Sequence, residues 1–188
     1  MTVPTFLTWL RVAAIPLILG VYALPHGWLA LPDRNLIATV LFILSAITDW
    51  FDGFLARRWN QSSAFGAFLD PVADKLMVSA ALLVLLELSR IGALVALIII
   101  GREIAISALR EWMARIGQSR KVAVNWLGKV KTATQMVAIP FLLYDGRLFG
   151  LIPTSLWGTW LLDIAAALTL WSMLYYFKLA LTSIELSE

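Results

Sequence analysis

Four aspartates lie within 26 residues of this chain: Asp49, Asp52, Asp70 and Asp74. The first two are three positions apart and the last two are four apart, so on helices each pair shares one face. The turn between the two segments is short and polar, Asn60-Gln-Ser-Ser. We therefore expect two antiparallel neighbouring helices that bring all four carboxylates to one end.

Four ionised carboxylates in one place repel one another unless a cation joins them. The chain has no cysteine and a single histidine, His26, which leaves carboxylate oxygens as the available ligands. Such ligands favour the hard ions Mg²⁺ and Mn²⁺, and a pair of ions would suit phosphoryl transfer. The simpler alternative is that each aspartate pairs with a nearby base, Arg57, Arg58 or Lys75.

The composition indicates the elements that must position these aspartates. Of 188 residues, 61% are hydrophobic and 14% charged, with a mean hydropathy of +0.84, against about 45–50% and about 25% in soluble domains. This excludes a disordered chain, a coiled coil and an ordinary cytosolic enzyme. Six segments approach the length of a membrane span. The sequence predicts an all-α integral membrane protein, a single catalytic domain over 1–188 with six transmembrane helices at 6–28, 36–59, 68–88, 91–112, 126–143 and 156–179.

The basic residues predict the orientation of these helices. With the N-terminus inside, the outer loops hold Arg34, Arg90 and Arg147, and the other twelve Lys and Arg lie inside. This bias explains the net charge of +3 without a nucleic acid partner. The first apolar run lacks a basic leader and is interrupted by Arg11, so we expect it to be retained rather than cleaved. Both termini and the aspartates are expected on the cytoplasmic side, in a bacterial inner membrane, with an organelle membrane as the alternative.

The aspartates stand in the pattern Asp49-x2-Asp52-Gly53-x2-Ala56-Arg57-x8-Gly66-x3-Asp70-x3-Asp74. At every fixed position this resembles the signature of the CDP-alcohol phosphatidyltransferases. The resemblance implies a six-helix membrane enzyme, usually a homodimer, that moves a phosphatidyl group from a CDP-linked lipid to an alcohol. The four aspartates would be its metal ligands, and Asp74 would also be its general base.

The other residues of the pattern suit a nucleotide. Gly53, Ala56 and Gly66 leave room for a nucleotide to approach the helices closely, and Arg57 has the fork geometry that binds a pyrophosphate. The alternative for the small residues is close helix packing in lipid. Asp52 and Thr8 complete the nucleotide-binding residues expected here.

Basic residues in the second half predict an anionic acceptor. Arg102 and Arg110 lie on the fourth apolar segment, and Lys131 and Thr132 begin the fifth. Converging there, they would bind a phosphomonoester, and the alternative is contact with lipid headgroups.

Three stretches resemble the branch of the family that makes phosphatidylglycerophosphate: Pro4-Thr-Phe-Leu-Thr-Trp-Leu-Arg11, Arg102-Glu103 followed by Arg110, and Gly128-Lys-Val-Lys-Thr-Ala-Thr-Gln135. Thr5 stands where that branch usually has Asn. The resemblance implies CDP-diacylglycerol as donor, glycerol 3-phosphate as acceptor and CMP as leaving group.

Other functions remain compatible with the pattern. Within the family, a cardiolipin synthase or a phosphatidylinositol-phosphate-type synthase would differ in its acceptor. A small transporter would use intramembrane acids as relays, but it predicts charges near the midplane and an inverted repeat. A non-catalytic scaffold of the same family would be expected to have lost one of the four aspartates. Asp163 and Glu87 receive no role.

Overall fold

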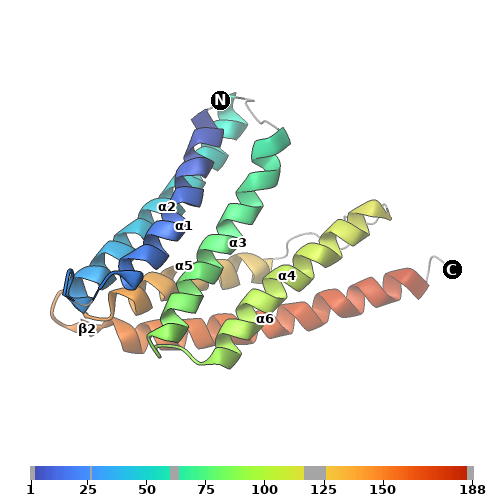
Figure 1. Cartoon of the computed structure of the whole chain (residues 1–188). Helices are drawn as coiled ribbons and strands as arrows, with labels where there is room; N and C mark the ends of the chain where they lie inside the picture. The colour runs from blue at the N-terminus through green and yellow to red at the C-terminus, as the bar shows by residue number, and fades with distance from the viewer. Residues whose placement is uncertain (1–2, 26, 60–63, 117–125, 186–188) are drawn as a thin grey trace.

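The computed structural model describes residues 3–25, 27–59, 64–116 and 126–185; the side chains of 52–59, among others, lie outside this description. Six helices and one short β-hairpin make up the described chain (Figure 1). Their order is α1 (Val3–Ala23), α2 (Leu31–Trp59), α3 (Ala64–Glu87), α4 (Ala93–Arg115), α5 (Trp126–Tyr144), β1 (Arg147–Leu148), β2 (Ile152–Pro153) and α6 (Thr154–Glu185).

The six helices coincide with the six apolar segments of the sequence, which confirms the helical fold class. One clear difference lies after α1, which ends at Ala23 and not at residue 28. Pro25 explains this, because proline disfavours a helical conformation in the residue before it. The sequence did not predict the hairpin between α5 and α6, in which Arg147 pairs with Pro153 and Leu148 with Ile152.

α1 joins the two helices that carry the aspartates. It packs along both α2 and α3, whereas among the described residues α2 and α3 make few direct contacts with each other. The expectation that α2 and α3 are close neighbours is therefore met only weakly. Each of them makes most of its contacts with α1, which lies beside both (Figure 1). α5 and α6 form the most extensive helix pair, α4 packs along α6 and α3, and α2 also contacts α5.

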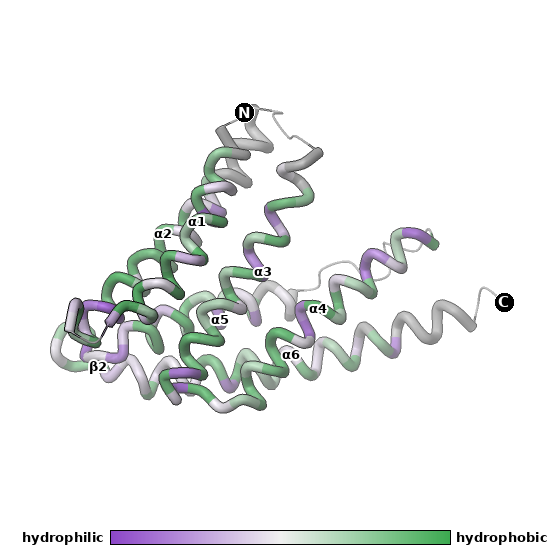
Figure 2. Tube along the Cα trace, in the orientation of Figure 1, coloured by the Kyte–Doolittle hydropathy of each residue, from purple (hydrophilic) through white to green (hydrophobic). Residues whose placement is uncertain are grey.

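The outside of the bundle is apolar and parts of its interior are charged. Large side chains such as Trp50, Leu97 and Trp171 are exposed, while Arg11 and Lys131 are fully buried. Green, hydrophobic stretches accordingly run along the helices, with few hydrophilic positions between them (Figure 2). This arrangement suits a protein whose surroundings are lipid.

Three of the described helices are long and apolar enough to cross a membrane by length and composition, over Phe6–Ala23, Leu31–Phe51 and Thr154–Tyr175.

Arg34, near the start of α2, forms hydrogen bonds with the end of α1 and with the loop that joins α1 to α2. Its guanidinium donates to the backbone oxygens of Leu29 (3.0 Å), Tyr22 (3.2 Å) and Pro25 (2.7 Å). The residue is buried rather than lying in a solvated loop. The carbonyls freed by the end of α1 thus find a donor within the protein.

Arg90 forms hydrogen bonds with backbone oxygens at the end of α5. Its Nη1 donates to the backbone oxygens of Leu142 and Leu143, both at 2.9 Å, and its Nη2 lies 3.0 Å from Asn35 Oδ1 and 3.2 Å from Asp145 Oδ2. One side chain therefore connects the α3–α4 turn with α2 and α5. These contacts lie at the end of the bundle opposite the aspartates.

Candidate active site

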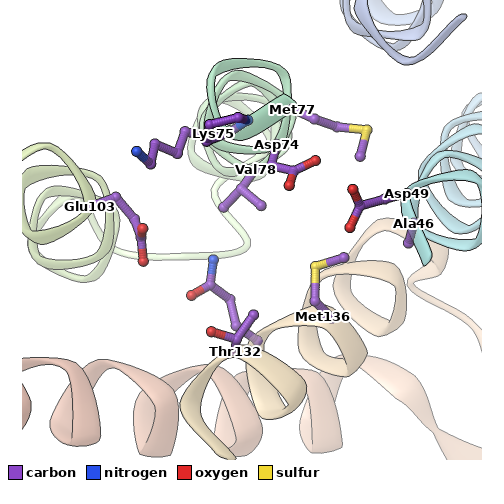
Figure 3. A pocket seen from close by; sticks show the side chains of 11 residues that line it. Ala46, Asp49, Asp74, Lys75, Met77, Val78, Glu103, Thr132 and Met136 are labelled. Carbon is purple, nitrogen blue, oxygen red and sulfur yellow. The ribbon is translucent and has the colours of Figure 1, made fainter. Parts of the chain in front are cut away.

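A cavity of about 240 Å³ lies between α2, α3, α4 and α5. Figure 3 shows Asp49 and Asp74 pointing toward each other from α2 and α3, with Glu103 entering from α4. Thr132 and Gln135 line the cavity from α5. Acidic groups of two helices thus face a polar wall formed by two others, which is an arrangement suited to bringing two substrates together.

Asp49 and Asp74 share one cation, the guanidinium of Arg11. The Nη1 atom of Arg11 lies 2.9 Å from Asp49 Oδ1 and 2.5 Å from Asp74 Oδ1. The arginine side chain is 0% exposed, while those of Asp49 and Asp74 are 40% and 42% exposed. The carboxylates are therefore open to the cavity on one side and held by a buried charge on the other.

Asp70 is also held from α1. The hydroxyl of Thr8 donates to Asp70 Oδ1 at 2.5 Å. Thr8 and Arg11 are three residues apart on one helix, so they project from the same face. α1 thus supplies a donor to Asp49, Asp70 and Asp74, the three aspartates of the pattern whose side chains are described.

The remaining residues of the aspartate pattern lie at the ends of α2 and α3. Asp52, Gly53, Ala56 and Arg57 belong to the last two turns of α2, and their side chains fall outside the described residues. Asp52 follows Asp49 by three residues in a continuous helix, so it shares that face. Gly66 is buried in the first turn of α3.

The predicted acceptor-binding bases gather around Glu103. Lys131 is fully buried and forms an ion pair with Glu103 Oε1, and Arg102 Nη1 lies 2.9 Å from the same oxygen. Arg110, two turns further along α4, is close enough for its charge to act on Lys131. The structure thus brings Arg102 and Lys131 together on one carboxylate oxygen.

Thr132, the fourth predicted residue, is exposed. Its hydroxyl donates to the backbone oxygen of Gly128 at 2.9 Å, and its side chain lines the cavity.

The sequence did not single out three residues of the site as candidates: Arg11, Glu103 and Gln135. Arg11 carried a signal, because a charge inside an apolar span is costly and therefore marks a function. Gln135 is 4% exposed and lines the cavity, and its Oε1 atom has no donor among the described residues. Since buried acceptors are normally paired, that oxygen is suited to a ligand hydroxyl.

The carboxylates fit a hard divalent cation. No three acidic or histidine side chains of the described part of the chain already form a cluster that would enclose a metal. However, Asp49 and Asp74 converge on a single positive atom, Arg11 Nη1, which shows that they can share one cation.

Fold and site together define a membrane-embedded helical protein in which two aspartates share a cavity with Glu103, the partner of two buried bases. The family model for CDP-alcohol phosphatidyltransferase matches residues 1–171. The chain belongs to this family, as its aspartate pattern predicted.

Bacterial relatives resemble the chain over almost its whole length. A protein of Salmonella choleraesuis is 49% identical over 180 residues, which cover 95% of this chain and 94% of the relative. A protein of Escherichia coli is similar at the same identity and coverage. Both carry the name CDP-diacylglycerol–glycerol-3-phosphate 3-phosphatidyltransferase.

Proposed function

We propose that this protein transfers the phosphatidyl group of CDP-diacylglycerol to sn-glycerol 3-phosphate, giving phosphatidylglycerophosphate and CMP. The observation that carries the proposal is the cavity lined by Asp49, Asp74 and Glu103. Behind its wall, Glu103 pairs with the buried bases Lys131 and Arg102. A carboxylate group suits the metal-bound pyrophosphate of the donor, and a basic cluster suits the phosphate of the acceptor. The names of the bacterial relatives support the same reaction.

The donor would bind along the ends of α2 and α3. The four aspartates would hold Mg²⁺ or Mn²⁺, in one or two ions that stabilise charge on the pyrophosphate and on the leaving CMP. Arg57 would bind the pyrophosphate, and Gly53, Ala56 and Gly66 would let the nucleotide lie close to the backbone. Asp52 and Thr8 would complete this part of the site.

Asp74 would act as general base. Its carboxylate is partly exposed and faces the cavity, where it would take the proton of the acceptor hydroxyl. The hydroxyl oxygen forms a bond to the lipid-linked phosphorus, and the bond from that phosphorus to the CMP oxygen breaks with its electron pair. Buried Arg11 lies 2.5 Å from Asp74 Oδ1 and would position this carboxylate before the metal binds.

The acceptor phosphate would bind at Lys131, Arg102, Arg110 and Thr132. Lys131 has three ammonium donors and gives one to Glu103, so donors remain for a phosphate. Glu103 would position Lys131 and Arg102 rather than touch the reacting atoms. The free Oε1 of Gln135 would accept a hydrogen bond from a hydroxyl of the glycerol.

The six helices would span the bacterial inner membrane with both termini and the cavity entrance on the cytoplasmic side, and the enzyme would work as a homodimer among membrane lipids. The excess of inner Lys and Arg supports this orientation. It also matches the substrates, because a water-soluble acceptor must meet a lipid at the interface.

A panel of acceptors tests the proposal. Purified protein with CDP-diacylglycerol and Mg²⁺ should release CMP with glycerol 3-phosphate and not with inositol phosphate, serine or phosphatidylglycerol. Release with one of the others alone would retain the family and reject the acceptor. No release with any alcohol would reject the reaction.

A further inference from the structure

Among the described residues, Arg11 forms ion pairs with aspartates of both α2 and α3, and it belongs to neither helix. It reaches Asp74 over 63 positions of sequence. Its side chain is fully buried, so its charge is expensive to place unless anions surround it. The attraction of the two carboxylates offsets the desolvation cost of the buried guanidinium, and Arg11 in turn reduces the repulsion between the carboxylates.

We infer that Arg11 is an internal cation that holds Asp49 and Asp74 together until a divalent metal displaces it, which makes it a positioning residue for metal entry. The inference rests on the metal site of the proposed function but not on the identity of the acceptor. It concerns the order of events at the carboxylates: the guanidinium occupies them first, and the metal must replace it.

The geometry of the contacts supports competition rather than coexistence. Arg11 Nη1 uses the Oδ1 atoms of Asp49 and Asp74 at 2.9 and 2.5 Å, whereas a metal such as Mg²⁺ binds carboxylate oxygens at about 2.0–2.1 Å. A guanidinium and a dication on the same oxygens would lie within a few ångströms of each other. Like charges that close repel strongly inside a protein, so metal binding and the Arg11 contacts oppose each other.

The contact of Thr8 with Asp70 differs from the contacts of Arg11, because a metal would not displace it. The Thr8 hydroxyl is neutral and bonds Asp70 without opposing a cation. One turn of α1 therefore offers a lasting contact to Asp70 and a displaceable one to Asp49 and Asp74. Metal binding would break the contacts of Arg11 with Asp49 and Asp74 and would keep the hydrogen bond from Thr8 to Asp70.

Direct measurement of Mn²⁺ binding tests this inference without substrate or turnover. Free Mn²⁺ is followed by electron paramagnetic resonance during titration of the purified full-length chain, as wild type, Arg11→Gln, Arg11→Lys and Asp74→Asn. Arg147→Gln is the matched control, because it removes one exposed positive charge at the opposite end of the bundle.

Arg11→Gln should bind Mn²⁺ about tenfold more tightly or better, since it removes a positive charge next to two ligands. Arg11→Lys should show a smaller gain, since a lysine is more flexible and more easily withdrawn, and Arg147→Gln should bind like wild type. A residue that merely supported the fold would give weaker or equal binding on substitution.

The outcomes separate the inference from the proposed function. If wild type binds Mn²⁺ and Asp74→Asn does not, the metal site stands, and equal or weaker binding by Arg11→Gln then overturns the inference alone. If wild type binds no Mn²⁺ at these carboxylates, both fail. Should Arg11→Gln not fold, Arg11→Lys decides, and unchanged or weaker binding by that variant contradicts the inference.

Discussion

Asp74 combines three features in one side chain: it faces the cavity, it is partly exposed, and it is held by a buried arginine. Asp74→Asn keeps the size of the side chain but can neither accept a proton nor supply a full negative charge. We expect kcat to fall by about 10³-fold or more, measured as CMP release, while the protein still inserts and purifies. Glu111→Gln is the matched control, because Glu111 is exposed and forms an ion pair with exposed Arg115. A comparable loss in that variant, or near-normal rates for Asp74→Asn, would contradict the role of Asp74.

Lys131 should act on the acceptor alone. Lys131→Gln removes the buried ammonium that would bind the acceptor phosphate, so the KM for glycerol 3-phosphate should rise by about tenfold or more, with little change in the KM for CDP-diacylglycerol. Arg115→Gln, which removes an exposed charge in the last turn of α4, should leave both values unchanged. An equal rise in both KM values would show that Lys131 supports the whole site rather than the acceptor.

At this scale the sequence predicted residue types better than their partners. Local spacing on helix faces selected Asp49, Asp70 and Asp74 as candidates, and Lys131 was selected by its place among the inner basic residues. Their contacts with Arg11, Thr8 and Glu103 were not predicted, since these join positions 28 to 63 residues apart, and such pairing depends on how the helices pack.

At the scale of elements, arginine side chains form hydrogen bonds with the backbone at the ends of two helices. Arg90 holds the last carbonyls of α5 and the side chains of Asn35 and Asp145. Arg90→Ala would leave these acceptors without their donor, which costs about 2 kcal/mol or more. For a chain of this size the thermal midpoint in detergent should fall by about 5 °C or more.

Arg147→Ala is the control for Arg90→Ala, because Arg147 is exposed in β1 and its loss should move the midpoint little. Equal midpoints for the two variants would refute a structural role for Arg90.

Hydropathy predicted where the helices lie but not how they touch. The six apolar segments became α1 to α6, and three of the described helices are long and apolar enough to cross a membrane. The short turn after α2 indicated that α2 and α3 would be direct neighbours, yet α1 provides most of their connection. An apolar surface in lipid packs about equally well against many partners, so the pattern of each helix does not select its neighbour.

At the scale of the whole molecule, the two ends of the bundle differ in their chemistry. One carries the aspartates and the basic cluster, and the other carries the β-hairpin and the arginines that close the helix ends. Because the chain has no cysteine, single cysteines report on orientation directly. Leu151→Cys at the hairpin and Arg115→Cys at the end of α4 are both exposed positions at opposite ends.

A membrane-impermeant maleimide should label Leu151→Cys in intact spheroplasts and Arg115→Cys in inverted membrane vesicles. This follows from the excess of Lys and Arg on the side of the aspartates. The reverse labelling would place the cavity on the outer side and contradict the proposed orientation.

Transfer of label from glycerol 3-phosphate into lipid tests the central claim most directly. With carbon-labelled glycerol 3-phosphate, CDP-diacylglycerol and Mg²⁺, the purified protein should move label into the lipid phase in equal amount to the CMP released. Chelation of the metal by EDTA, or Asp74→Asn, should abolish both products. Release of CMP without labelled lipid, or transfer that survives both EDTA and Asp74→Asn, would contradict the account.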